Sequence, residues 1–111
     1  MEETAIMVKL NAAVSHHQRE LEELRQDPEL AIAYLKVALE SLEDPDQVGA
    51  ALLALRTVAE ACGGMGALAV NAGLSRETLY RTLSENGNPT LKTLVALLSS
   101  LGLRLTVEPR H

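Results

Sequence analysis

The sequence predicts an all-α fold with five to six helices and one short strand at its C-terminal end. The 111 residues include no Phe, no Trp and two Tyr, while 47% of them are hydrophobic and 23% are charged. The apolar set is therefore mostly Leu, Ala, Val, Ile and Met. Ala and Leu favour helices, whereas aromatic and β-branched residues favour strands. Residue types that begin and end helices also recur along the chain.

The first predicted helix is amphipathic and covers residues 4–26. Its apolar residues, with one histidine included, follow alternating steps of three and four. They are Met7, Leu10, Val14, His17, Leu21 and Leu24. This heptad pattern is short, so we interpret residues 1–26 as an amphipathic helix that contacts a second copy or a partner. Residues 27–111 would form the main domain.

Two Asp-Pro pairs predict the starts of the next two helices. Asp27 supplies an N-cap and Pro28 a first helical residue, so the second helix should begin there and run to about Leu42. Asp44, followed by Pro45 and by Gln47 three positions after it, gives a capping-box pattern for a third helix. Gly63-Gly64 should end that helix. The inward face of this third helix is predicted to be Val48, Leu52, Leu55 and Ala59.

Three further elements follow. A short helix over residues 65–72 should end at Gly73, and Ser75 should begin the next one. The composition of residues 86–89 predicts a turn, after which Thr90 begins the last helix. The inward residues of that helix are predicted to be Leu91, Leu94, Leu98 and Leu101.

The C-terminal segment alternates apolar and polar residues from Leu103 to Val107, between Gly102 and Pro109. This alternation predicts a short strand. The sequence leaves open whether the strand pairs across a dimer or with another protein.

Charge is divided unevenly along the chain. Residues 1–46 carry four basic and eleven acidic side chains, whereas residues 47–111 carry six and four, within a net charge of −5. Because salt screens repulsion beyond about 10 Å, a locally basic surface can still bind phosphate. The pattern allows a C-terminal half that faces DNA and an N-terminal half that suits a basic partner.

Several other classes of function are not expected. No apolar run reaches the roughly 20 residues that span a bilayer, and the N-terminus is acidic, so we expect a cytoplasmic protein with no membrane contact. The single cysteine, Cys62, is interpreted as a small apolar residue. The adjacent His16 and His17 diverge on a helix, and no serine has His and Asp partners at useful positions. We therefore expect no enzyme, no metal and no cofactor.

The segment Leu68–Leu79 has the spacing of a helix-turn-helix. Ala69 is small where two helices would cross, Gly73 permits the left-handed turn, Leu74 enters the core and Ser75 begins the second helix. An ordinary helical hairpin is the alternative interpretation.

Helical geometry places polar side chains on the outer face of that second helix. At 100° per residue, Leu79 and Leu83 lie within about 40° of each other and face inward. The opposite side and its flanks would face the major groove of DNA. The candidate DNA-binding residues are Ser75, Arg76, Glu77, Thr78, Tyr80, Arg81 and Ser84.

Each of these side chains suits a particular contact. Arg81 can donate two hydrogen bonds to guanine, Glu77 can accept from cytosine, and Thr78 can contact a base edge or a thymine methyl group. Arg76 lies where a phosphate would be held. The alternative is a solvated face on which the arginines pair with Glu77 or Glu85.

Several segments resemble the addiction-module antidote family, whose members are HigA-like antitoxins with a Cro/C1-type (XRE) helix-turn-helix. They are Ala33–Leu35, Ala38–Glu40, Ala54–Ala59, Gly73–Ser84, Gly87–Leu91 and Leu101–Leu105. The resemblance covers about residues 27–109, and Gly66 departs from the Gln that the broader helix-turn-helix class often has. It implies a RelE/ParE-like toxin partner and autorepression of a shared operon.

The sequence therefore leads to one hypothesis and two alternatives. The hypothesis is a homodimeric antitoxin, residues 27–111 being its helix-turn-helix domain, that binds a palindromic operator in double-stranded DNA. Its acidic half would bind the cognate toxin, and the candidate partner-binding residues are Glu20, Glu22, Glu23 and Glu29. These carboxylates could instead form a solvated face. The alternatives are a stand-alone repressor and a helical adaptor that binds no DNA.

Overall fold

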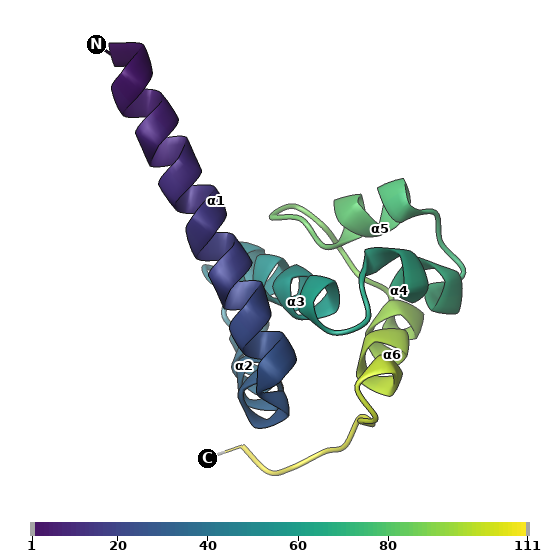
Figure 1. Cartoon of the computed structure of the whole chain (residues 1–111). Coiled ribbons are helices and arrows are strands. Elements are labelled where there is room, and N and C mark those ends of the chain that lie inside the picture. The colour runs from purple at the N-terminus through teal and green to yellow at the C-terminus, as the bar shows by residue number, and fades with distance from the viewer. Residues whose placement is uncertain (1, 111) are drawn as a thin grey trace.

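The structure, a computed structural model, describes the backbone of residues 2–110 and the side chains of residues 4, 5 and 15–110. Within residues 2–110 it contains six helices and no strand, which confirms the all-α class (Figure 1). The helices are α1 (Glu2–Gln26), α2 (Pro28–Ser41), α3 (Val48–Ala61), α4 (Met65–Ala72), α5 (Arg76–Thr82) and α6 (Leu91–Ser100).

Three helices begin at the predicted residues, because a side-chain oxygen satisfies a free backbone N–H in each first turn. Asp27 accepts a hydrogen bond of 3.1 Å from the backbone N–H of Leu30 at the start of α2. Ser75 and Thr90 accept equivalent bonds of 3.1 Å and 3.2 Å at the starts of α5 and α6.

The predicted start of the third helix was wrong by several residues. Asp44 does not begin α3, because its carboxylate accepts a 3.0 Å hydrogen bond from the backbone N–H of Asp46, two residues further on. This local turn competes with a helical first turn. Gln47 is the N-cap instead, and its side chain makes no capping bond.

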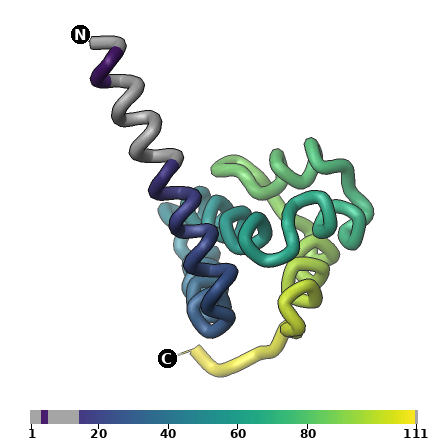
Figure 2. The backbone as a smooth tube through the Cα atoms, viewed as in Figure 1, coloured from purple at the N-terminus to yellow at the C-terminus, as the bar shows by residue number. Residues whose placement is uncertain are grey.

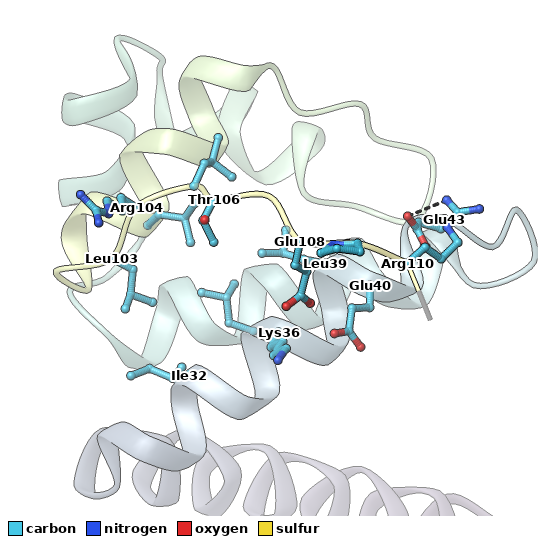
Figure 3. Close-up of a pocket in the computed structure, with 14 residues that line it drawn as sticks. Ile32, Lys36, Leu39, Glu40, Glu43, Leu103, Arg104, Thr106, Glu108 and Arg110 are labelled. Carbon is cyan, nitrogen blue, oxygen red and sulfur yellow. Dashed lines mark hydrogen bonds and ion pairs between the residues drawn. The ribbon is translucent and has the colours of Figure 1, made fainter.

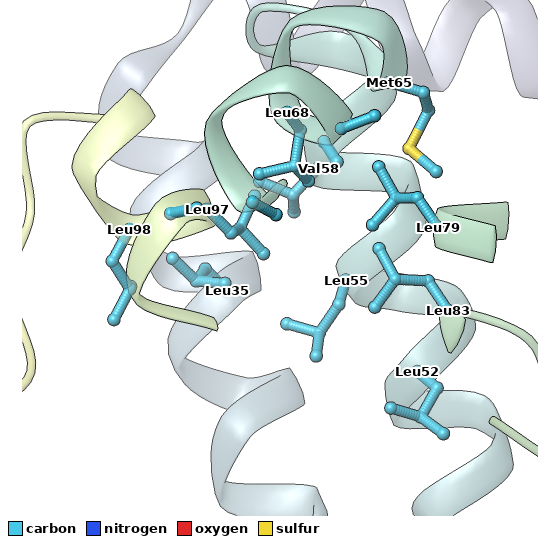
Figure 4. Close-up of a cluster of buried hydrophobic side chains, with 14 of the residues drawn as sticks. Leu35, Leu52, Leu55, Val58, Met65, Leu68, Leu79, Leu83, Leu97 and Leu98 are labelled. Carbon is cyan, nitrogen blue, oxygen red and sulfur yellow. The ribbon is translucent and has the colours of Figure 1, made fainter. Parts of the chain in front are cut away.

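The core lies between α3 and the helices that surround it (Figure 4). Leu55 and Val58 of α3, Leu79 of α5 and Leu83, the C-cap residue of α5, are completely buried. The other buried members of this cluster are Leu35, Ala38, Leu52, Ala59, Met65, Leu68, Ala69, Ala72, Ala96, Leu97 and Leu98. Since Leu79 within α5 and Leu83 at its C-cap both enter this cluster, the core fixes the orientation of α5.

The inward face of α6 differs from the prediction. Leu97 is buried, whereas Leu91, which was expected to face inward, is 66% exposed. Leu91 is the first residue of the helix and belongs to neither buried cluster. Thr93 is buried in its place, because its hydroxyl group has a partner 3.1 Å away in the hydroxyl of Thr90.

The C-terminal part of α1 packs against α2 and α3 (Figure 2). Leu24 is buried with Ala31 and Ala61, and Arg25 donates a 3.2 Å hydrogen bond to the carbonyl of Ala61 at the end of α3. Met7, Leu10 and Val14 of the predicted heptad pattern lie outside the residues whose side chains are described. The division at residue 26 stays a prediction.

The predicted C-terminal strand does not form. Residues 103–110 run back from α6 towards α2 without regular secondary structure (Figure 1). A strand needs a ladder of hydrogen bonds to a neighbouring strand. No second strand is present within residues 2–110, so this segment has no partner in its own chain.

No single helix in the described part of the chain is both long and apolar enough to cross a membrane. Taken together, α3 and α4 have sufficient length and apolar composition, but they are bent by 105° relative to each other.

Candidate functional site

The turn between α4 and α5 sets the direction of α5. Gly73 has a φ of +70°, in the left-handed region that glycine adopts without steric cost. The backbone N–H of Leu74 donates a 2.9 Å hydrogen bond to the carbonyl of Ala69, which closes the end of α4. Leu74 itself is half-buried. The two short helices are therefore joined as the sequence predicted.

The outer face of α5 carries the charged residues. Glu77 and Arg81 are exposed on this face, while Leu79 and the C-cap residue Leu83 are fully buried on the opposite side. Arg76 is also exposed, but it lies in the first turn and not opposite the two leucines. This division follows from the 100° spacing of helical residues. The structure thus places three predicted DNA-binding side chains together in solvent.

The two hydroxyl residues of the first turn are bonded to each other. Ser75 accepts from the backbone N–H of Thr78, and its own hydroxyl donates a 2.9 Å hydrogen bond to the hydroxyl of Thr78. Thr78 is half-buried. Both predicted site residues therefore hold the helix start, and the lone pairs that they do not use remain available to a ligand.

The remaining two predicted DNA-binding residues, Tyr80 and Ser84, are only partly exposed. Tyr80 is half-buried, and the guanidinium of Arg56 lies over its ring at 5.4 Å from the ring centre. Ser84 is also half-buried and donates a 2.6 Å hydrogen bond to the carbonyl of Arg81. Both side chains help to shape the end of α5.

Arg56 of α3 is a positioning residue that the sequence analysis did not identify. Its guanidinium donates hydrogen bonds of 2.9 Å to the carbonyl of Leu83 and 3.1 Å to the carbonyl of Tyr80. Carbonyls at the C-terminal end of a helix lack helical partners and carry partial negative charge. Arg56 therefore holds the C-terminal end of α5 against α3. The available signal was one arginine between buried residues of an apolar helix.

Lys92 of α6 was also missed. Its ammonium group would lie 3.0 Å from a Cβ atom built on Gly73, so it borders the turn that precedes α5. Together with Arg76 and Arg81, Lys92 brings the number of basic side chains on and beside α5 to three. Two acidic side chains, Glu77 and Glu85, lie in the same region of the sequence. The sequence could not show this proximity, because Lys92 follows Gly73 by nineteen positions.

The turn after α5 depends on Gly87. A Cβ atom there would lie 1.9 Å from the carbonyl oxygen of Thr82 and 2.8 Å from that of Arg81. Contacts this short with backbone atoms cannot be relieved by a side-chain rotation. Only glycine allows the chain to pass so close to the end of α5.

The acidic candidates lie on α1 and the start of α2, on the other side of the molecule from α5 (Figure 1). Glu20 accepts a 2.7 Å hydrogen bond from the hydroxyl of Tyr34. Burial, together with this bond and the carboxylate charge, raises the pKa of Tyr34 to about 12. The phenol therefore keeps its proton, and can keep donating this bond, at a pH above the ordinary pKa of tyrosine.

The remaining acidic candidates are exposed. Glu23 lines a hollow of about 500 Å³ together with Glu20, Leu30 and Tyr34. Glu22 lies 3.6 Å from Arg25 and accepts a 2.9 Å hydrogen bond from Gln26. Glu29 lies in the first turn of α2. The structure thus brings Glu20 and Glu23 to one hollow, which Glu22 and Glu29 do not line.

The thiol of Cys62 is half-buried beside the core. Burial raises its pKa, while the charge of Arg25 lowers it by a smaller amount. Since the thiolate is the reactive form, this environment disfavours reactivity.

Comparison with known proteins identifies the family. Residues 16–109 match a family model described as "probable addiction module antidote protein". The chain belongs to this antidote family. The match includes the second half of α1, which the sequence resemblance had left out. An antidote implies an antitoxin role and a cognate toxin as partner.

One relative is similar to most of the chain. An uncharacterized protein of Haemophilus influenzae (strain Rd) is 36% identical over 74 residues, which is 67% of this chain and 75% of the relative. No solved structure matches the chain.

Proposed function

We propose that this protein is a DNA-binding antitoxin that neutralises a cognate toxin and represses its own operon. The observation that carries the DNA-binding part is the outer face of α5, where Glu77 and Arg81 are exposed while the opposite face is buried in the core, with Arg76 exposed at the first turn. A side chain that contacts base edges must be both exposed and held at a fixed angle. The α4–α5 pair meets both requirements.

In this proposal α4 and α5 form a Cro/C1-type helix-turn-helix of the HigA-like kind. Arg81 and Glu77 contact base edges in the major groove, and Arg76 and Lys92 contact phosphates. A homodimer would place two α5 helices about 34 Å apart on a palindromic operator. The protein would act in the cytoplasm by binding alone, without a cofactor or catalytic step.

The DNA-binding part predicts a strong dependence on salt. Titration against the DNA upstream of its own gene should give an affinity that falls steeply with salt concentration, because bound basic side chains release counterions. Arg81→Ala should cost about 1 to 3 kcal/mol on the preferred site and weaken discrimination between base pairs. Binding can be followed by fluorescence anisotropy with the operator and a scrambled duplex.

Arg19→Ala is the matched control, since Arg19 is an exposed arginine on α1. It removes the same charge far from α5 and should leave base-pair discrimination unchanged. If Arg81→Ala kept the wild-type preference for the operator, Arg81 would not contact the bases. An affinity that did not change with salt would contradict the proposed interface.

The toxin-binding part is supported by the family and by the acidic surface of α1 and α2. We propose a RelE/ParE-like toxin with a basic surface. Glu20, Glu22, Glu23 and Glu29 would face it, with Leu30 and Tyr34 supplying apolar contacts in the hollow. The family favours this function over a stand-alone repressor. The exposed charged face of α5 favours it over an adaptor that binds no DNA.

Reversal of one acidic charge should slow toxin binding. Glu23→Lys should lower the association rate with the toxin about ten-fold at low salt, and the difference should shrink as salt rises. Asp46→Lys is the control, because Asp46 is exposed in the turn before α3 and is not part of this hollow. Equal effects of the two substitutions, measured by surface plasmon resonance, would argue against the α1–α2 surface.

A further inference from the structure

The C-terminal segment is attached to the rest of the chain at its two ends and has no regular secondary structure between them. At one end the backbone N–H of Leu103 donates a 2.8 Å hydrogen bond to the carbonyl of Leu98. At the other end Arg110 forms a 2.9 Å ion pair with Glu43, in the turn that follows α2. Between these two attachments, residues 104–109 make no backbone hydrogen bond to any other described residue. Their donors and acceptors are free for a ladder.

A hollow of about 780 Å³ separates this segment from α2 (Figure 3). Its apolar lining comes from Ile32, Leu35 and Leu39 of α2 and from Leu98, Leu103 and Leu105. Leu105 is 48% exposed and Val107 is 96% exposed. Apolar side chains therefore stand beside free backbone groups, as they do at an unpaired sheet edge.

The sequence of this segment is complementary to itself in one antiparallel register. If Thr106 lies on a two-fold axis, Arg104 of each copy lies opposite Glu108 of the other, so two ion pairs form on one face. On the other face Leu105 lies opposite Val107 twice. Within one extended chain Arg104 and Glu108 are about 13 Å apart, so only a second copy can bring these charges together.

Neighbouring registers lose these pairs. With Leu105 on the axis, Arg104 would lie opposite Thr106 and Glu108 opposite Gly102. With Val107 on the axis, Arg104 would lie opposite Arg110. A slip by one residue would pair Leu105 with Thr106 and mix the two faces. Only the register centred on Thr106 matches charge with charge and apolar with apolar.

We propose that residues 103–109 pair with the same residues of a second copy as an antiparallel two-stranded ribbon centred on Thr106. A two-stranded ribbon alone is marginal in water. Ile32, Leu35 and Leu39 on the α2 side of the hollow, where Lys36 and Glu40 also lie, offer apolar surface against which it can pack. The inference refines the homodimer of the proposed function. It is tested without DNA or toxin, so its failure and the failure of DNA binding are distinguishable.

Cysteine crosslinking tests the register. In a Cys62→Ala background, Thr106→Cys should form a disulfide-linked dimer under oxidised glutathione, because directly opposed residues have Cβ atoms about 5 Å apart. Leu105→Cys and Val107→Cys are the controls. Each would face its own copy only diagonally, at about 7 to 8 Å between Cα atoms, beyond normal disulfide reach. Crosslinking that is strongest at position 105 or 107 would overturn the proposed register.

Charge reversal tests the pairing in solution. Arg104→Glu places like charges opposite each other twice and should weaken dimerisation about ten-fold, as measured by sedimentation equilibrium. The double variant with Arg104→Glu and Glu108→Arg should restore the wild-type dissociation constant. All three substituted positions, 104, 106 and 108, are exposed, so the fold should be preserved. A monomeric wild-type protein, or a dimer that responds to neither variant, would overturn the proposal.

Discussion

Leu79→Ala is expected to lower the free energy of unfolding by about 2 to 5 kcal/mol. Leu79 is completely buried in the cluster that joins α5 to the rest of the protein. Its truncation removes apolar contacts and leaves a cavity that the close packing of the core can fill only in part. Urea unfolding followed by circular dichroism measures this loss. Operator binding should weaken as well, because α5 is no longer held in a fixed orientation by its contact with the core.

Val70→Ala provides the matched control for this prediction. Val70 is an apolar residue of α4, but it is 79% exposed. Its truncation should change stability by no more than about 0.5 kcal/mol, as is usual for surface substitutions. A Leu79 variant as stable as the Val70 variant would show that α5 does not depend on this buried contact.

Arg56→Met is expected to lower the free energy of unfolding by about 2 to 3 kcal/mol and to weaken operator binding without a direct contact to DNA. The substitution removes two charge-assisted hydrogen bonds to the carbonyls of Tyr80 and Leu83, together with the contact to the Tyr80 ring. Hydrogen exchange of the backbone N–H of Leu83 should accelerate, because the last turn of α5 opens more often.

Arg56→Lys separates charge from geometry. Lysine keeps the positive charge but cannot direct two fixed donors at both carbonyls, so its effect should lie between those of wild type and Arg56→Met. Exchange at the end of α5 that is identical in all three proteins would contradict the positioning role. A loss of operator binding with unchanged exchange would instead point to direct contact between Arg56 and DNA.

The predictions that succeeded rest on interactions between residues close in sequence. Asp27, Ser75 and Thr90 each bond a backbone N–H three residues later, and Gly73 supplies its own backbone conformation. The error at Asp44 is also local. Its carboxylate accepts from the backbone N–H of Asp46, two residues later, and composition alone did not indicate that this turn would be preferred over a helical cap.

The outward face of α5 could be predicted from helical periodicity, because burial of Leu79 and Leu83 forces Glu77 and Arg81 to the other side. The residues of other helices that lie beside α5, Arg56 and Lys92, could not be predicted in this way. Arg56 precedes Leu83 by 27 positions, and local periodicity does not indicate which distant elements meet.

The all-α class, most helix boundaries and the polarity of α5 follow from the order of residues alone, because they depend on spacing and on hydrogen bonds within one turn of chain. Contacts between distant segments bring Arg56 and Lys92 beside α5, bury Leu97 rather than Leu91 and place Glu20 and Glu23 in one hollow. They also leave residues 103–107 without a partner strand in the described part of the chain. An alternating pattern gives a segment the capacity to pair, but a ladder forms only where folding or assembly supplies the second strand.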